Sequence, residues 1–84
     1  MESDRPFHGL ASFPMGTRVR IGDRSTLEEF LRTWQYHHKL ESDQLDFAGR
    51  VTSVEDIFMY HGGDIIYKLQ NAPGLWHQQL LEVA

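Results

Sequence analysis

Alternation of apolar and polar residues with a period of two recurs along the chain and predicts short β-strands. In residues 16–22, Val19 and Ile21 alternate with Arg18 and Arg20, as expected for a first strand with one buried face. Runs rich in β-branched and aromatic residues predict further strands at 50–54, 57–61, 64–69, 75–77 and 80–83. The sequence therefore predicts a mainly β domain with a small sheet of about five strands.

One segment between the first two predicted strands has the helical period instead. Its apolar stripe at i, i+3, i+4 and i+7 is formed by Leu27, Phe30, Leu31 and Trp34. Ser25 is the expected N-cap, and Glu28 three residues later completes a capping box. Glu28 and Arg32 are expected to pair on the wet side of the helix. We expect a helical insertion at about 25–38, followed by a short turn at 42–45.

Gly62 and Gly63 separate two β-rich runs and predict a two-residue hairpin, because a type I′ turn needs positive φ at both positions. The cross-strand pairs expected from this turn are Tyr60 with Ile65, Phe58 with Tyr67, and Met59 with Ile66. Pro73 and Gly74 suit the central positions of a type II turn.

The chain divides into an arm and a folded domain. Residues 1–13 have no periodicity and are expected to form a flexible arm, whose Phe7, Leu10 and Phe13 could dock on the domain. Residues 14–84 are the expected domain. Its predicted core consists of Val19, Ile21, Val51, Phe58, Ile65, Tyr67, Leu69 and Trp76.

The order of strand, long insertion, strand, Gly-Gly hairpin, strand, Pro-Gly turn and Trp resembles an SH3-like barrel, and more narrowly the C-terminal barrel of the nitrile hydratase β subunit. The positions that carry the resemblance are Gly16, Val19, Ile21, Gly49, Arg50, Val51, Tyr67, Lys68, Leu69, Leu75 and Trp76. The family has a proline-containing loop where this chain has the predicted helix. Its metal is held by cysteines of the other subunit, so the resemblance implies a barrel that packs against a partner and no catalytic residues.

Composition narrows the possible functions. The chain has no cysteine, which excludes disulfides, thiolate nucleophiles and Cys-ligated zinc. Its first residues lack the apolar run of a secretory signal, and no segment has the length of a membrane span, so we expect a cytoplasmic protein. The net charge of −4 disfavours nucleic-acid binding, although Arg18, Arg20 and Arg24 leave it as an alternative.

Five histidines raise a second alternative, a small metal-dependent enzyme or ligand binder. It would use His61, Asp64, His77 and either His37 or His38. Zinc needs three or four converging ligands, and adjacent helical residues such as His37 and His38 diverge. A cross-strand polar pair is the simpler interpretation of His61 and Asp64, so no metal ligand or cofactor is assigned. The carboxylates lie in polar stretches typical of a solvated surface, and phosphate-binding and nucleophile motifs are absent from the sequence.

Aromatic residues are the most informative feature, because tryptophan and tyrosine are frequent in interface hot spots. We therefore expect a non-catalytic protein-interaction or accessory-subunit module, with a protein partner or a second copy bound between the helix and the barrel. The candidate partner-binding residues are Trp34, Tyr36, His37, His38, Tyr60, His61 and Trp76.

Overall fold

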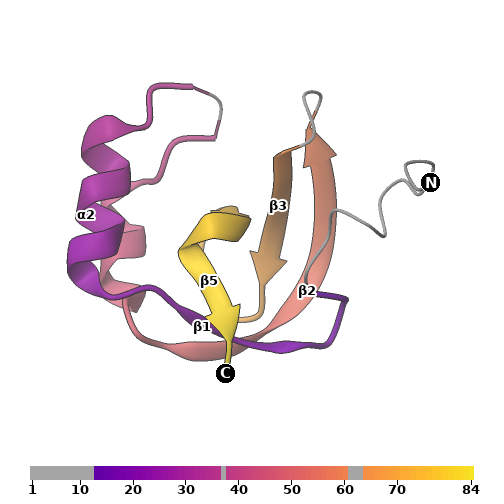
Figure 1. Ribbon diagram of the computed structural model, residues 1–84. Helices are drawn as coiled ribbons and strands as arrows, with labels where there is room; N and C mark the ends of the chain where they lie inside the picture. The colour runs from indigo at the N-terminus through magenta and orange to yellow at the C-terminus, as the bar shows by residue number, and fades with distance from the viewer. Residues whose placement is uncertain (1–12, 37, 61–63) are drawn as a thin grey trace.

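The computed structural model describes residues 13–36, 38–60 and 64–84 (Figure 1). The elements in chain order are β1 (Arg18–Ile21), α2 (Arg24–Thr33), the 3₁₀ turn η1 (Ser42–Phe47), β2 (Val51–Tyr60), β3 (Asp64–Leu69), β4 (Trp76–His77), the 3₁₀ turn η2 (Gln78–Leu80) and β5 (Leu81–Val83). The predicted mainly β class is confirmed. In the described ranges, no helix combines the length and the apolar character that a membrane crossing requires.

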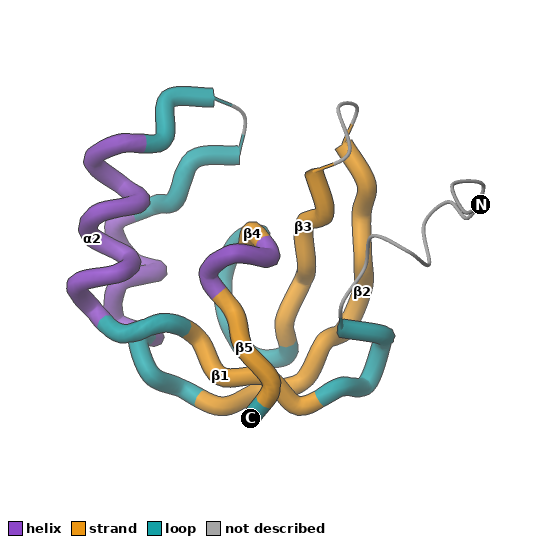
Figure 2. The backbone as a smooth tube through the Cα atoms, in the orientation of Figure 1, coloured by secondary structure: helices purple, strands orange, loops and turns teal. Residues whose placement is uncertain are grey.

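All five strands belong to one antiparallel sheet with the order β4-β3-β2-β1-β5. The long strand β2 pairs with two strands. Its first residues pair with β1, and the rest pair with β3. A bulge lies between Val54 and Asp56, where the pairing shifts by one residue. The sequence predicted two separate strands here, at 50–54 and 57–61, which is wrong, because the bulge lets one strand curve without ending. Figure 2 shows the resulting curvature of β2.

The predicted hairpin register is wrong by one residue. Tyr60 pairs with Asp64, Met59 with Ile65, and Phe58 with Ile66. The connection therefore has three residues rather than two; these residues, 61–63, include the predicted Gly-Gly turn and lie outside the described ranges. A one-residue slip exchanges the faces of a strand. Consequently Ile57, and not Phe58, lies opposite the buried Tyr67, and the Phe58 side chain is 42% exposed.

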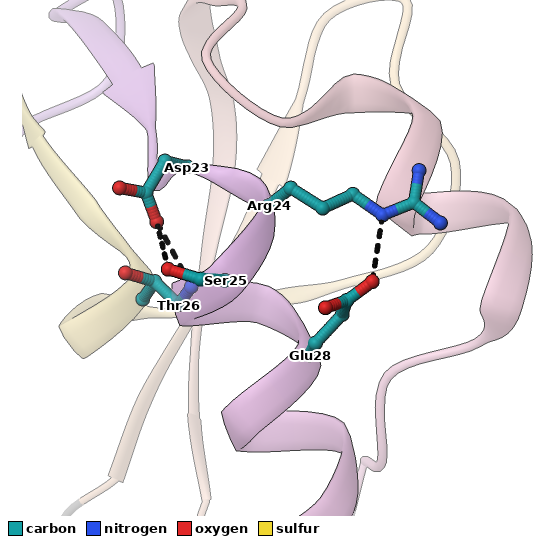
Figure 3. A network of polar contacts seen from close by, with 5 residues as sticks. All are labelled: Asp23, Arg24, Ser25, Thr26 and Glu28. Atoms are coloured by element: carbon teal, nitrogen blue, oxygen red, sulfur yellow. Dashed lines mark hydrogen bonds and ion pairs between the residues drawn. The ribbon is translucent and has the colours of Figure 1, made fainter.

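The N-cap of helix α2 lies two residues earlier than predicted, at Asp23 and not at Ser25. The Asp23 carboxylate accepts hydrogen bonds from the Thr26 backbone N–H at 2.9 Å and from Ser25 Oγ at 3.2 Å (Figure 3). These contacts, the backbone N–H of Thr26 first, hold the pKa of Asp23 below its ordinary value of 3.8. Glu28 pairs with Arg24 at 3.0 Å rather than with Arg32.

The helix also ends earlier than expected, at Thr33 rather than near His38. The Trp34 backbone N–H still donates to the Phe30 carbonyl at 2.8 Å, but its ψ of 120° turns the chain out of the helix. Trp34 is therefore the C-cap residue and the first residue of a loop. This early end decides where the aromatic side chains of this segment lie.

The core fills the inner face of the curved sheet and is closed by the helix. Leu27 and Phe30 are the buried residues of α2, and Phe13 packs its ring against Tyr67 with 5.5 Å between the ring centroids. The predicted core residues that are buried are Val19, Ile21, Ile65, Tyr67, Leu69 and Trp76. Val51 is 37% exposed, so its assignment to the core is wrong, as is that of Phe58.

A buried glutamine attaches the segment after the helix to the turn before β4. Gln44 is 1% exposed, accepts a hydrogen bond from the Glu41 backbone N–H at 2.7 Å, and donates from Nε2 to the Leu75 carbonyl at 3.1 Å. Gly74 lies beside it with φ of +70°, and a Cβ added at Gly74 would meet Gln44 Cδ at 3.0 Å. The positive φ that the sequence predicted for Gly74 is thus confirmed, while the type II turn itself stays a prediction.

Candidate functional site

Four rings from two distant parts of the chain form one aromatic cluster. Phe30 stacks on Trp34 with 5.1 Å between centroids and 14° between the ring planes. Tyr36 meets Trp34 edge to face at 5.0 Å. The imidazole of His77, from β4, lies 4.9 Å from Trp34 and 5.0 Å from Phe30. Phe30 and His77 are buried, whereas Tyr36 is 69% exposed, so the cluster runs from the core to the surface.

The end of the helix and a short strand bring this cluster together. Phe30 and Trp34 are four residues apart, the spacing that places side chains on one face of a helix. His77 reaches the same place because β4 pairs with β3. Its Nε2 lies 3.0 Å from the His38 carbonyl oxygen, which can only accept, so this ring nitrogen carries the proton. This hydrogen bond fastens the backbone at His38, where φ is 51°, to β4.

A cavity of about 520 Å³ adjoins the cluster. It is lined by Phe13, Trp34, Asp64, Ile65, His77, Gln78, Gln79 and Leu81, and we call it the Trp34 groove. Figure 1 shows α2 and the β2–β3 hairpin on opposite sides of the molecule, with η2 and β5 between them. Among its lining residues, Trp34 comes from the end of the helix, Asp64 and Ile65 come from the start of β3, and Gln78 and Gln79 come from η2, whose part of the lining we call the floor.

Polar contacts position the floor of the groove. The Tyr67 hydroxyl donates to Gln78 Oε1 and accepts from the Phe13 backbone N–H at 3.4 Å. Tyr67 is fully buried, so its hydroxyl links the segment before β1 to η2 from inside the core. Gln79, the next residue of the floor, is exposed. The groove thus presents carboxamide groups and aromatic rings on a supported backbone, as a pre-formed binding surface requires.

Only part of the predicted partner-binding set lies at this groove. Trp34 lines it, and Tyr36 contacts Trp34. His38 contributes its backbone carbonyl. Trp76 is fully buried and belongs to the core, so its assignment to a binding surface is corrected. His37, His61 and the side chain of Tyr60 lie outside the described part of the structure.

Sequence reasoning missed several residues of the groove. Phe13 was placed in the arm as a residue that could dock on the domain, but not at a binding site; it is 7% exposed and lines the cavity. Gln78 and Gln79 were not singled out, because nothing in a pair of glutamines indicates that they face a cavity. His77 was considered only as a metal ligand. The available signal was the helical spacing of Phe30 and Trp34, which indicated one end of the cluster.

The alternative functions find little support in the residues that the structure describes. No group of three or more His, Asp or Glu side chains in these residues could hold a metal ion. Of the three arginines considered for nucleic-acid binding, Arg20 pairs with Glu82 at 3.4 Å and Arg24 with Glu28 at 3.0 Å. The carboxylates in the polar stretches, which were expected on a solvated surface, are exposed: Glu28, Glu29, Glu41, Asp43, Asp46, Glu55 and Asp56.

One indole nitrogen in the core has no hydrogen-bond partner. Trp76 Nε1 is the single buried side-chain N or O atom in this condition within the described ranges. Trp76 is not among the residues that line the Trp34 groove, so this donor is not aimed at a ligand there.

A scan against protein-family models and searches of curated proteins and of solved structures find no match to this chain.

Proposed function

We propose that this protein is a non-catalytic protein-interaction module of the SH3-like barrel class, and that the Trp34 groove receives an extended segment of a partner protein. The observation that carries the proposal is the groove itself, about 520 Å³ in volume and bordered by a partly buried tryptophan. Tyr36 packs edge to face on that tryptophan and is 69% exposed, so an aromatic ring of a type enriched at interfaces stands at the surface next to Trp34.

The sheet supports the barrel assignment. The curved strand β2 takes part in pairing with both β1 and β3, and the edge strands β4 and β5 are separated by the three residues of η2. In this interpretation α2 is an insertion between the first two strands of a half-open barrel. The resemblance to the barrel of the nitrile hydratase β subunit stays a prediction. The role of an accessory subunit, which that resemblance implies, also stays a prediction.

The composition of the groove favours binding over catalysis. Its described side chains are aromatic, aliphatic and carboxamide groups with one carboxylate, and the histidine among them is packed against two rings. Acid-base catalysis needs two titratable groups in distinct environments around a substrate. A surface that combines aromatic side chains with a few fixed polar groups is typical of peptide recognition.

Selection of random twelve-residue peptides on the immobilised domain, followed by NMR titration of the selected peptides, tests this proposal. We expect the enriched peptides to shift backbone resonances of Trp34, Ile65 and Gln79, and to bind the Trp34→Ala variant at least about tenfold more weakly. Leu31→Ala is the matched control, because Leu31 lies on the same helix and is 37% exposed. Failure to enrich any peptide, or shifts confined to other surfaces, would contradict the proposal.

A further inference from the structure

The outer edge of β2 is covered by β1 over only part of its length. The last backbone hydrogen bonds on that side join Val54 to Gly16 at 2.8 Å and to Thr17 at 2.9 Å. The chain before Thr17 leaves β2 through a turn, in which the Thr17 N–H donates to the Pro14 carbonyl at 3.0 Å (Figure 2). Within the described ranges, residues 55–60 of β2 therefore have β3 on one side and an open edge on the other.

The bulge decides which backbone groups face this open edge, because successive residues of a strand direct their N–H and carbonyl groups alternately to its two sides. Val54 directs both groups to the side of β1. The extra residue of the bulge between Val54 and Asp56 reverses the alternation, so the backbone groups of Ile57 and Met59 point away from β3. In agreement, the Ile57 N–H donates to Asp56 Oδ1 at 2.9 Å. Met59 is thus placed to pair with a further strand.

The side chains along the edge are apolar and partly exposed. Phe58 is 42% and Met59 is 45% exposed, and as neighbours in a strand they lie on opposite faces of the sheet. Natural proteins commonly protect an exposed edge with lysine or proline, and residues 55–60 contain neither. The charges are confined to Glu55 and Asp56 at one end, where Glu55 pairs with Lys68 at 3.6 Å. The remaining edge is suited to strand addition.

We infer that a second copy of this chain pairs with this open edge, the two β2 strands running antiparallel about a two-fold axis at Phe58. In this register the backbone groups of Ile57 in each copy meet those of Met59 in the other. The Ile57 N–H exchanges its bond to Asp56 for one to the Met59 carbonyl of the other copy. Phe58 lies directly opposite its counterpart, so two partly exposed rings are buried against each other.

The position of the charges favours a second copy as the occupant. A two-fold interface uses the same patch on both copies, so the patch has to be complementary to itself. With the axis at Phe58, Asp56 lies opposite Tyr60 of the other copy, and the acidic residues of the two copies are at opposite ends of the interface. An axis at Asp56 would instead set two carboxylates against each other. Phe58 and Met59 do not line the Trp34 groove, so this interface is separate from the proposed peptide site.

Sedimentation equilibrium of the full chain over a range of concentrations tests the inference. We expect a weak, concentration-dependent dimer, because an interface formed by one short strand from each copy is at the small end of specific interfaces. Amide hydrogen exchange, followed by NMR, reports the edge itself. The Met59 N–H should exchange more slowly as the dimer forms, whereas the Phe58 N–H, directed to β3, should be protected at every concentration.

Charged substitutions at Phe58 test the register. Phe58→Lys and Phe58→Glu each set two like charges opposite one another at the axis, so each should raise the dissociation constant of the dimer by at least about tenfold. An equal mixture of the two variants pairs opposite charges and should dimerise again. Val51→Lys and Val51→Glu are the matched controls, because Val51 is 37% exposed on the same strand but lies where β1 covers the edge. They should leave dimerisation unchanged.

Four results would overturn the inference. They are the mass of a single chain at all concentrations up to about 1 mM, a dimer that both Phe58 variants leave unchanged, a mixture of these variants that stays monomeric, and equal effects of the Val51 variants. Protection of the Met59 N–H in a monomer would also overturn it, since residues 1–12 would then cover the edge in place of a second copy. If thermal melting shows that the Phe58 variants are unfolded, the parent protein decides, and a Met59 exchange rate independent of concentration contradicts the inference.

Discussion

The stacking of Phe30 on Trp34 makes a prediction about how the groove is supported. The substitution Phe30→Leu keeps an apolar side chain of similar length at a position that is 5% exposed. It removes the stacked contact with Trp34 at 5.1 Å and the tilted contact with His77 at 5.0 Å. Trp34 should lose the ring that packs against it, while the leucine side chain still fills the space on the inner face of the sheet.

The magnitude follows from the two ring contacts. Each aromatic pair contributes about 0.5–1.5 kcal/mol beyond the burial of its area, so the loss of both lowers the free energy of unfolding by about 1–3 kcal/mol. Urea unfolding followed by circular dichroism measures this value. With an m value of about 1 kcal/mol per molar urea, the midpoint should fall by about 1–3 M while m is unchanged.

Leu31→Ala is the control on the same helix, because its side chain is 37% exposed and its loss should change stability by less than about 0.5 kcal/mol. The reasoning is refuted if Phe30→Leu destabilises the protein no more than Leu31→Ala does. It is also refuted if the NMR resonances of Trp34 and His77 are the same in Phe30→Leu as in the parent protein, since the ring would then not hold them.

Three further predictions concern the supports of the fold. Gln44→Ala should lower the free energy of unfolding by about 2–4 kcal/mol, because two backbone groups lose their partner, and urea unfolding measures it. Gly74→Ala should cost more than about 1 kcal/mol, since φ is +70° and the new Cβ would meet Gln44; a melting temperature equal to that of the parent contradicts this. The hydrogen bonds from Thr26 and Ser25 depress the pKa of Asp23, so their stabilisation is complete above the ordinary pKa of 3.8 and is lost as the pH falls below it. Unfolding midpoints at pH 6 and pH 2.5 should therefore differ more for the parent than for Asp23→Asn, which keeps the acceptor and cannot titrate.

The sequence predicted those parts of the fold that depend on local periodicity. Val19 and Ile21 alternate with arginines, and both are buried in β1. The hairpin register could not be derived in the same way, because it depends on the length of the connection, and the Gly-Gly pair suggested a two-residue turn. The bulge beside Asp56 is also non-local, since it is defined only by the partners that β2 finds in β1 and β3.

The prediction of the helix boundaries was wrong for a different reason. Asp23, Ser25 and Thr26 are all good capping residues, and the capping box at Ser25 and Glu28 was as plausible as the cap at Asp23. In the folded chain the Asp23 carboxylate accepts from the Thr26 backbone N–H and Glu28 pairs with Arg24, but the sequence alone allowed either arrangement. The C-terminal end has no glycine or proline near Thr33, so no local signal marked it.

The candidate site was predicted as a region rather than as a set of residues. The end of the helix was expected to border a groove, and Trp34 lies there. Trp76 was assigned to the same surface and is instead fully buried. The groove floor at Gln78 and Gln79 could not be foreseen, because the short strand β4 and the turn η2 reach that position through pairing with β3, which is a tertiary effect.

The two tryptophans offer the most direct test of the central claim, that the Trp34 groove is the binding site. Their indole N–H signals report two places in one NMR experiment, because Trp34 lines the groove and Trp76 is fully buried. When a selected peptide is added to the protein, we expect the signal of Trp34 to move with saturation and that of Trp76 to stay in place. A signal of Trp34 that stays fixed while the peptide is bound elsewhere would contradict the claim.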